Sequence, residues 1–257
     1  MFDRTVLIGV GGIGSALVDN LAKVIAFQDV LPKDLVLVDP QTFEGRNRTR
    51  QRMNPDEEGS FKVEVAAKRI RAAHPELRVS SLAKYVSKNP RESDAIRGEE
   101  VFKERSIILS AIDHQGGRGY FSELCRKRRD ILMLNGGNRV HDGHVYAYLI
   151  QDGAEHTKRL EEIYPNIANP PPEERNPGDL SCEERHVLPG GEQLLATNNM
   201  VASWMLAAYS GIIENVPKGK EAVSERFRKK TEVIFDIQTF SVAFYSHATR
   251  LPKKVLA

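Results

Sequence analysis

Apolar runs and helically spaced segments alternate along the first half of the chain. Residues 5–10 form a short β-branched, apolar run, which is typical of a buried strand. From residue 13 to about residue 27 the apolar side chains recur at intervals of three and four, which predicts a helix. Residues 35–38 predict a second strand, which Asp39 closes. Because a helix joins the two strands, we expect them to pair in parallel through a right-handed crossover.

The same two patterns predict most of the remaining elements. We expect strands at 107–111, 131–135 and 145–150, a weak strand from residue 79, two strands around Gln238 within 233–245, and helices at 62–73, 93–102, 121–128 and 194–213. Gly136 and Gly137 are expected to end the strand before them, and residues 141–144 to form a hairpin turn. Residues 41–60 and the proline-rich residues 164–191 are expected to be mostly loop.

This order of elements predicts an α/β fold. We expect a Rossmann-like, mostly parallel sheet with helices on both faces and antiparallel strands toward the C-terminus. The chain has 257 residues, of which 40% are hydrophobic and 28% charged, so a substantial core can form without covalent staples.

Composition excludes several classes of function. Lys plus Arg is 37 and Asp plus Glu is 35, a formal net charge of +2, which gives no global reason to expect nucleic acid or an anionic membrane as a partner. The charged run 225–230 is interpreted as a solvated face. The two cysteines exclude a disulfide-rich scaffold and a four-cysteine zinc site, and the histidines lack ligand spacing, so no zinc is expected. Without a signal peptide or a membrane-length apolar run, we expect a cytoplasmic protein.

A glycine-rich turn follows the first predicted strand. Its glycines are Gly9, Gly11, Gly12 and Gly14. Glycine allows a tight turn and a close approach of phosphate to the backbone, and the N-terminus of the following helix favours an anion. Asp39, at the end of the next strand, is placed to accept hydrogen bonds from ribose hydroxyls. The turn therefore predicts nucleotide binding; the alternative is a turn that only packs a helix on a sheet.

An arginine-rich segment follows Asp39. Residues 46–52 contain four arginines, beside the predicted phosphate site. A dinucleotide needs little extra positive charge there, whereas displacement on a triphosphate develops negative charge that cations stabilise. The segment therefore favours a triphosphate over a nicotinamide or flavin dinucleotide. Taken alone, it is also consistent with a solvated basic loop.

Four stretches together resemble the ThiF family, the bacterial relatives of ubiquitin-activating enzymes, which include activators of the molybdopterin and thiamine pathways. Residues 9–15 resemble its GxGGxGS turn, and residues 37–39 with 47–51 resemble its LxD and NxxRQ segment. Residues 59–62 resemble its GxxK, and residues 113–118 its DNxxxR motif, with His114 in place of asparagine. Residues 160–182 are similar to the members called PRTRC-type.

The resemblance implies a single adenylation domain over 1–257. Its parts would be a nucleotide-binding core (1–150), a proline-rich crossover loop (151–192), and a C-terminal helix with strands (193–257). It implies that ATP is attacked by the C-terminal carboxylate of a small ubiquitin-like or sulfur-carrier protein, giving an acyl-adenylate and pyrophosphate. It also implies Mg²⁺, which prefers carboxylate oxygen, and a homodimer.

Residue roles follow from the matching positions. The resemblance implies that Asp39 holds the ribose, that Asn47, Arg50 and Lys62 contact the phosphates, that Gln51 belongs to the same nucleotide-binding segment, and that Asp113 holds Mg²⁺. Arg50, Lys62 and Asp113 are the expected catalytic groups, with Cys182 as an acceptor of the activated acyl group. For Asp113 the alternative is a helix cap, and for Cys182 an inert loop cysteine. Cys125 is expected in the core.

The chain also departs from the family pattern. No N-terminal arm precedes the first strand, so an arginine reaching the partner's ATP is absent unless Arg4, Arg46 or Arg48 replaces it. Gln41 occupies the place of a second acidic residue after Asp39, and paired CxxC motifs are missing. Two other functions therefore stay open: a nucleotide-binding but inactive scaffold or partner subunit, and a nicotinamide oxidoreductase.

Overall fold

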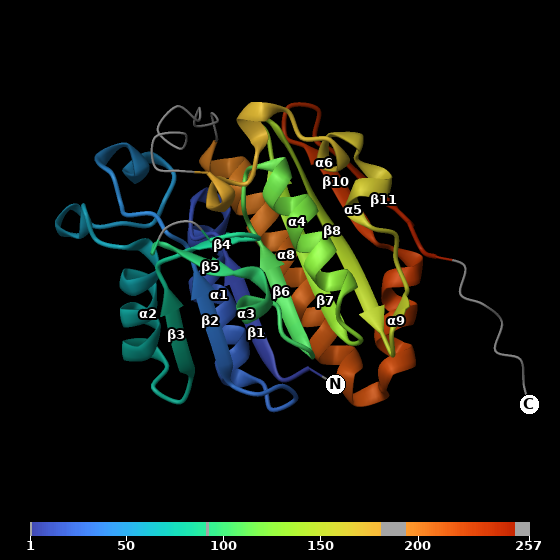
Figure 1. Ribbon diagram of the computed structural model, residues 1–257. Coiled ribbons are helices and arrows are strands. Elements are labelled where there is room, and N and C mark those ends of the chain that lie inside the picture. The colour runs from blue at the N-terminus through green and yellow to red at the C-terminus, as the bar shows by residue number, and fades with distance from the viewer. Residues whose placement is uncertain (1, 91–92, 181–193, 250–257) are drawn as a thin grey trace, which may run out of the picture.

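The computed structural model describes residues 2–90, 93–180 and 194–249, and its centre is a mixed β-sheet (Figure 1). The strand order is β11-β10-β8-β7-β6-β1-β2-β3, and β9 (Ala154–Glu155) pairs with β8. The strands of this path are β1 (Arg4–Ile8), β2 (Asp34–Val38), β3 (Arg78–Leu82), β6 (Ser106–Ser110), β7 (Ile131–Asn138), β8 (Asp142–Gln151), β10 (Glu232–Asp236) and β11 (Ser241–Tyr245). The short strands β4 (Tyr85–Ser87) and β5 (Ala95–Arg97) form a separate parallel pair.

The sheet is parallel in its first half and antiparallel in its second. Strands β3, β2, β1, β6 and β7 pair in parallel, whereas β8, β10 and β11 are antiparallel to their neighbours. This confirms the predicted Rossmann-like fold class and the parallel β1–α1–β2 unit. Because parallel strands share one carboxyl edge, the residues that follow β1, β2 and β6 meet there.

Helices cover both faces of the sheet (Figure 1). They are α1 (Gly12–Phe27), α2 (Lys62–Ala73), α3 (Gly98–Val101), α4 (Gln115–Arg126), α5 (Leu160–Ile163), α6 (Pro165–Ala168), α8 (Leu195–Asn215) and α9 (Lys220–Lys229), with short 3₁₀ turns η1 (Gly45–Thr49), η2 (Pro55–Glu57), η3 (Pro172–Glu174), η4 (Pro177–Asp179) and η5 (Val216–Lys218). Buried residues of α1, α2, α8 and α9 form one core, and those of α4 to α6 form the other. Alternation within β1 divides its side chains between them: Leu7 joins the first core, Val6 and Ile8 the second.

Glycine caused two errors in the predicted boundaries. Strand β7 continues through Gly136 and Gly137, because each glycine leaves room for a packed side chain: a Cβ there would lie 2.4 Å from Met205 Sδ and 2.3 Å from Arg118 Nη2, respectively. Helix α4 begins at Gln115 rather than near residue 121, and includes Gly116 and Gly117.

Two further predictions were wrong in part. The expected helix over 93–102 is strand β5 followed by the short helix α3, since only its last residues are helical. The expected turn at 141–144 falls earlier, because Asp142 already begins β8 and pairs across the sheet. Helix α9 was not predicted; its apolar face is only Val223 and Phe227 within a charged sequence.

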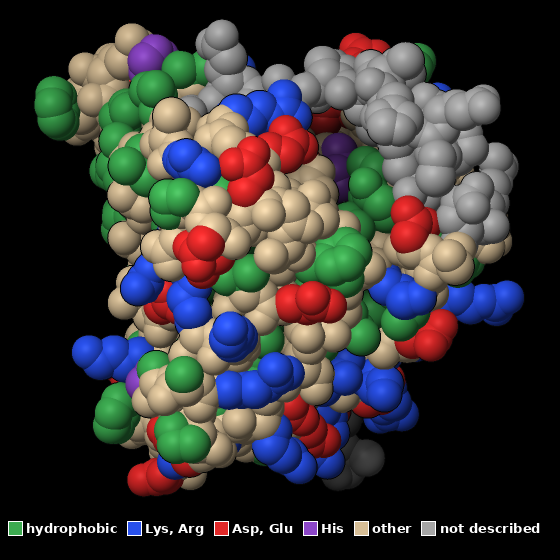
Figure 2. Space-filling model, turned by 90° about the vertical axis from the view of Figure 1, so that its left-hand side faces the viewer, with side chains coloured by type: hydrophobic (Ala, Val, Ile, Leu, Met, Phe, Trp, Pro, Cys, Tyr) green, Lys and Arg blue, Asp and Glu red, His purple; other side chains and the backbone are tan. Residues whose placement is uncertain are grey.

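The surface carries mixed charges. Figure 2 views the side on which α2 lies in Figure 1, and lysine and arginine side chains are interspersed there with aspartate and glutamate. Among the described residues, none of the helices has the length and apolar content needed to cross a membrane.

Candidate active site

The glycine turn between β1 and α1 requires glycine at two positions. Gly9 has φ of +90°, and a Cβ on it would lie 2.7 Å from the carbonyl oxygen of Ala111. A Cβ on Gly14 would lie 1.9 Å from the carbonyl oxygen of Gly9. Gly11 is the N-cap of α1 and would meet no atom within 4 Å, so its outer side is open. Together with Gly12, which begins α1, these residues leave the helix N-terminus without a side-chain cap, as anion binding requires.

Asp39 fastens this turn to the neighbouring strand. Its carboxylate accepts hydrogen bonds from the backbone N–H of Val10 (2.6 Å) and of Gln41 (2.8 Å), and the residue is 5% exposed. Burial raises the pKa of Asp39, and the charge of Lys62 and the two backbone donors oppose that rise. Asp39 therefore organises the backbone of the turn, at the position predicted for a ribose contact.

Lys62 brings a buried positive charge to the same edge. It begins α2, is 3% exposed, and its Nζ donates to Gln41 Oε1 at 2.9 Å. Burial lowers the pKa of Lys62, while the charges of Asp39 and Glu44 raise it. No carboxylate among the described residues forms an ion pair with this ammonium group, so its charge is available to a ligand.

The four arginines of the arginine-rich segment differ in their partners. Arg46 pairs with Glu44 (2.5 Å) and Arg48 with Glu58 (3.0 Å), and Arg52 contacts Asp19. Arg50 forms no ion pair with any described residue, and its Nε is buried without a hydrogen-bond partner there. Of the four, Arg50 is the one whose charge is not offset by a neighbouring carboxylate.

Asn47 and Gln51 shape the turn that carries Arg50. Asn47 Oδ1 accepts from the backbone N–H of Glu44 (2.9 Å), and the Asn47 carbonyl accepts from the N–H groups of Arg50 and Gln51. Asn47 is 5% exposed. Its carbonyl oxygen and its side-chain oxygen are both used as acceptors in and around η1. Gln51 is buried, and its Oε1 has no hydrogen-bond partner among the described residues.

Asp113 lies beyond the end of β6, near the other charged groups. Its charge acts on Asp39, Lys62 and Arg118, and its carboxylate is exposed with no hydrogen bond or ion pair to any described residue. The alternative that Asp113 caps α4 is wrong: His114 is the N-cap, and its Nδ1 accepts from the backbone N–H of Gly117 at 3.1 Å. Burial lowers the pKa of His114 to about 4, which suits this acceptor role.

Arg118 is a residue that the predicted site did not include. It is 4% exposed, and its guanidinium donates to the carbonyl of Ile112 (2.8 Å from Nη2) against the bare backbone of Gly137. Burial lowers the pKa of Arg118, and the charges of Asp113 and Glu174 raise it. Arg118 ends residues 113–118, the stretch that resembles the DNxxxR motif, and that match was the available signal.

The arginines considered as substitutes for a partner-reaching arginine are otherwise engaged. Arg4 donates from Nε to Ser106 Oγ (3.1 Å) and contacts the carbonyl of Val101, at the start of β1 and away from the glycine turn. Arg46 and Arg48 form the ion pairs described above. None of the three is free within the described residues.

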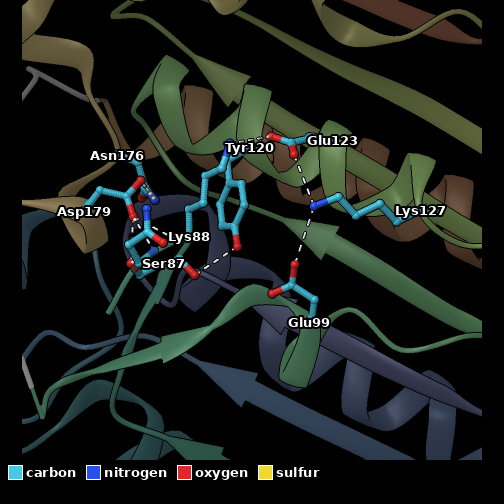
Figure 3. Close-up of polar contacts among 9 residues, drawn as sticks. Ser87, Lys88, Glu99, Tyr120, Glu123, Lys127, Asn176 and Asp179 are labelled. Atoms are coloured by element: carbon cyan, nitrogen blue, oxygen red, sulfur yellow. Dashed lines mark hydrogen bonds and ion pairs between the residues drawn. The ribbon is translucent and has the colours of Figure 1, made fainter. Parts of the chain in front are cut away.

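Cys182 lies outside the described residues, but the chain that leads to it is fixed (Figure 3). Asp179 accepts from Ser87 Oγ (2.6 Å) and from the backbone N–H of Lys88 (2.8 Å), and Asn176 Nδ2 donates to its other oxygen (3.1 Å). Tyr120 of α4 donates to the carbonyl of Ser87 (2.9 Å). These contacts hold η4 against β4. Cys125 is buried in α4 as predicted, and burial raises the pKa of its thiol.

Pockets occur within the described part of the chain. A polar one of about 310 Å³ lies between α1, residues 48–52 and the start of α8, and Arg50 and Gln51 line it. A larger one, of about 620 Å³, lies between α8, α9 and the antiparallel strands and contains no predicted site residue. The candidate site is therefore identified by the charged residues that line it and not by the volume of its pocket.

The structure brings most of the predicted groups together. The glycine turn, Asp39, Lys62, Arg50 and Asp113 lie at the carboxyl edge of the parallel strands. No group of three His, Cys, Asp or Glu side chains suited to a metal gathers among the described residues. Mg²⁺ commonly binds through one or two carboxylates plus substrate phosphates and water, and the exposed carboxylate of Asp113 fits that donor set.

A model of the ThiF family matches residues 2–247 of this chain. The chain is 28% identical to the SAMP-activating enzyme E1 of Haloferax volcanii over 151 residues, which is 58% of this chain and 50% of that protein. It is 27% identical to the ubiquitin-activating enzyme E1 1 of Schizosaccharomyces pombe over 122 residues, 47% of this chain and 12% of that enzyme. These matches thus cover half or less of the relatives' length.

Solved structures share the fold at low identity. A structure of MccB from E. coli with ATP has a TM-score of 0.66 at 18% identity, covering 98% of this chain and 65% of that one. The biosynthetic enzyme MccB in complex with N-formylated MccA has a TM-score of 0.68 at 16% identity, covering 99% and 67%. PaaA has a TM-score of 0.67 at 17% identity, covering 96% and 65%.

Proposed function

This chain belongs to the ThiF family, and from that premise we propose that it adenylates the C-terminal carboxylate of a small ubiquitin-like or sulfur-carrier protein at the expense of ATP. One observation carries the proposal. Arg50 lines a pocket with Ser15 in the first turn of α1, whose N-terminus has no side-chain cap, and Lys62 acts on Asp39, which holds the turn before that helix. Neither cation is paired with a carboxylate of the described residues. Positive charge without a partner at such a place suits a triphosphate.

The proposed reaction needs positioning and charge more than proton transfer. A carboxylate oxygen of the protein substrate attacks the α-phosphorus of ATP, and a bond forms between them. The bond from that phosphorus to the bridging oxygen breaks, and pyrophosphate leaves with the electron pair. Arg50 and Lys62 would offset the negative charge that develops on the phosphates, and Asp39 would hold the glycine turn in place.

Asp113 would hold Mg²⁺ at this site, with the remaining positions taken by phosphate oxygens and water. When bound, Mg²⁺ would supply further positive charge to the phosphates. Asn47 and Gln51 would support the same subsite through the turn that carries Arg50.

Relatives support the class of substrate. The matched proteins are named for activation of SAMP and of ubiquitin, and MccB has been solved with ATP and with MccA. Because the chain spans only part of these proteins, we carry over only the adenylation step that the residues above can serve. The whole chain would then act as one adenylation unit.

Two finer proposals concern Cys182 and assembly. Cys182 would accept the activated acyl group as a thioester, in which case Cys182→Ala retains adenylation and loses a reducible adduct. A homodimer would cover the start of α8, where Leu194 and Leu195 are 39% and 51% exposed. Sedimentation at two concentrations tests the dimer.

Pyrophosphate exchange tests the main proposal. The protein is incubated with ATP, Mg²⁺ and labelled pyrophosphate, with and without a peptide ending in Gly-Gly. Exchange that depends on the carboxyl end supports adenylation. ATP binding without any exchange would favour an inactive partner subunit. Binding of NAD in place of ATP would contradict both.

A further inference from the structure

A pocket of about 620 Å³ lies outside the candidate active site, between α8, α9 and the antiparallel strands. Its volume is within the range of pockets that hold small organic ligands. Its floor is formed by Val145 and Ala147 of β8 and Val233 of β10, and none of the three is more than 7% exposed. Burial of apolar surface on such a floor is favourable, so the pocket suits a ligand with an apolar body.

Two aromatic rings flank this pocket. Trp204 of α8 and Phe244 of β11 both line it and meet edge to face, with their ring centroids 5.6 Å apart. Beside Trp204 the lining residues of α8 are Ala207 and Ala208, whose short side chains leave room between the helix and the sheet. The two rings therefore bridge α8 and β11, and a slender ligand can pass beside them where the broad surface of a folded protein cannot.

Positive charge gathers along the α9 side of the pocket. Arg226 lies across Gly211 of α8, since a Cβ on that glycine would overlap the guanidinium group. Lys230 follows α9, and its Nζ lies 5.1 Å from the centroid of the Phe244 ring. Both cations line the pocket, and neither forms an ion pair with any residue that the structure describes.

The two glutamates that line the pocket are engaged with other partners. Glu225 pairs with Lys229, at 3.3 Å. Glu232 alternates with Val233 along β10, so its side chain lies on the opposite face of the sheet, where its carboxylate contacts His247 Nε2 at 3.0 Å. The lining thus combines an apolar interior with two unpaired cations. This is the complement of an apolar molecule that carries one negative group.

We propose that this pocket binds a small amphipathic carboxylate, a straight apolar chain that ends in one carboxylate group. The chain would contact Val145, Val233 and the ring of Trp204, and the carboxylate would lie between Arg226 and Lys230. Burial of the chain supplies most of the affinity, whereas the cations, both exposed to solvent, contribute less and select for an anion. The pocket is separate from the proposed adenylation site, so the proposal stands independently of that function.

Trp204 is the one tryptophan of the chain, so its fluorescence reports on this pocket directly. The full chain is titrated with decanoate, with octanoate and with decylamine, which is a cation of similar length. We expect decanoate to change the emission of Trp204 saturably, with one molecule bound per chain by calorimetry. Octanoate should bind about fifteenfold more weakly, because each buried CH₂ group changes the dissociation constant about fourfold. Decylamine should bind at least about tenfold more weakly, because its charge is repelled.

Substitutions separate the contribution of charge from that of the apolar interior. Arg226→Gln and Lys230→Gln should each weaken binding of decanoate about threefold, and together about tenfold, while narrowing its advantage over decylamine. Ala208→Leu fills the interior and should abolish binding of both chains. Lys103→Gln, at an exposed position that does not line the pocket, is the matched control for net charge. Thermal unfolding checks that each variant is folded.

Four results would overturn the proposal. Unchanged Trp204 emission in decanoate would show that the pocket does not take this ligand. Equal binding of decanoate and decylamine would remove the role of the two cations, and undiminished binding in a folded Ala208→Leu variant would place the ligand elsewhere. Loss of decanoate binding as the protein concentration is raised would assign the pocket to contact with a second copy of the chain.

Discussion

At the scale of single residues, the sequence could name the candidate cations but not rank them. Residues 46–52 present four arginines at equal spacing, and nothing in that pattern separates Arg50 from its neighbours. The structure separates them through their partners: Glu44 is two residues from Arg46, but Glu58 and Asp19 are 10 and 33 residues from Arg48 and Arg52. Ion pairs between distant positions depend on tertiary structure, which explains why a motif match was needed to select Arg50.

Removing an unpaired cation should affect chemistry, whereas removing a paired one should not. We expect Arg50→Ala and Lys62→Ala each to lower the rate of pyrophosphate exchange about a hundredfold, corresponding to about 3 kcal/mol of lost transition-state stabilisation. Arg48→Ala, which removes a cation already paired with Glu58, should change the rate less than about threefold. Equal losses in all three variants would contradict the distinction between paired and unpaired cations.

Substitution by alanine should affect different properties at two glycines of the same turn, namely stability at Gly14 and nucleotide binding at Gly11. In Gly14→Ala the new Cβ would lie 1.9 Å from a backbone oxygen, so we expect a loss of at least about 3 kcal/mol in the free energy of unfolding. In Gly11→Ala the Cβ meets no protein atom, so the fold should persist, but ATP would approach a backbone that now carries a methyl group. Urea denaturation and nucleotide titration check the pair; a stable Gly14→Ala would show that the turn relaxes.

At the scale of elements, periodicity predicted the first βαβ unit and helix α2 closely. It failed at glycines, because a glycine can end an element or can make room for a packed side chain within one. The helix expected over 121–128 begins at Gln115 and includes Gly116 and Gly117, because His114 caps it there. Gly136 and Gly137 were interpreted as the end of a strand, yet they make room for Met205 and Arg118. For Gly136 and Gly137 a tertiary contact decides, which the local sequence does not contain, whereas the cap by His114 is a local contact.

The hydrogen bonds that Asp179 accepts should hold η4 to β4 independently of the rest of the site. Asp179→Ala leaves the buried hydroxyl of Ser87 and the N–H of Lys88 without their acceptor, so we expect a loss of about 2 kcal/mol in stability. Asp179→Asn keeps an acceptor oxygen and should lose less, and Glu173→Ala, at an exposed position of η3, serves as the control. Hydrogen exchange at the backbone amide of Lys88 measures its hydrogen bond to Asp179 directly. Unchanged protection of that amide in Asp179→Ala would contradict the role of this hydrogen bond.

At the scale of the whole molecule, the candidate site depends on the order of strands. Strands β1, β2 and β6 are adjacent in the sheet although β6 is about seventy residues from β2 along the chain, and this adjacency brings Asp113 near Asp39 and Lys62. The alternation of elements predicted a mostly parallel sheet but not this order. Cys182 lies outside the described residues, so its role remains a prediction of the family resemblance.

Folding of the whole chain also partly buries a histidine, whose Nε2 is fully covered, and this should make stability depend on pH. His144 lies in β8 with its ring 5.5 Å from that of Tyr164, and burial, aided by the charges of Arg118 and Arg139, lowers its pKa to about 3. In the unfolded chain the pKa of histidine is about 6.5, so the unfolded state binds more protons between these values. Stability should therefore fall as the pH decreases from about 6.5 toward 3, by about 1–2 kcal/mol at pH 5 from this group.

The variant His144→Gln isolates that contribution, because glutamine does not titrate. Other groups, among them the carboxylates, contribute to the same curve, so the informative quantity is the difference between the two proteins rather than either curve alone. Urea denaturation at pH 8, 7, 6 and 5 gives the free energy of unfolding of both proteins. It should fall less steeply with decreasing pH for His144→Gln than for the unmodified chain, whatever the difference in stability between them at pH 8. Parallel curves would mean that His144 binds its proton equally well in the folded and the unfolded chain, which would contradict the effect of its burial and of the nearby charge of Arg118.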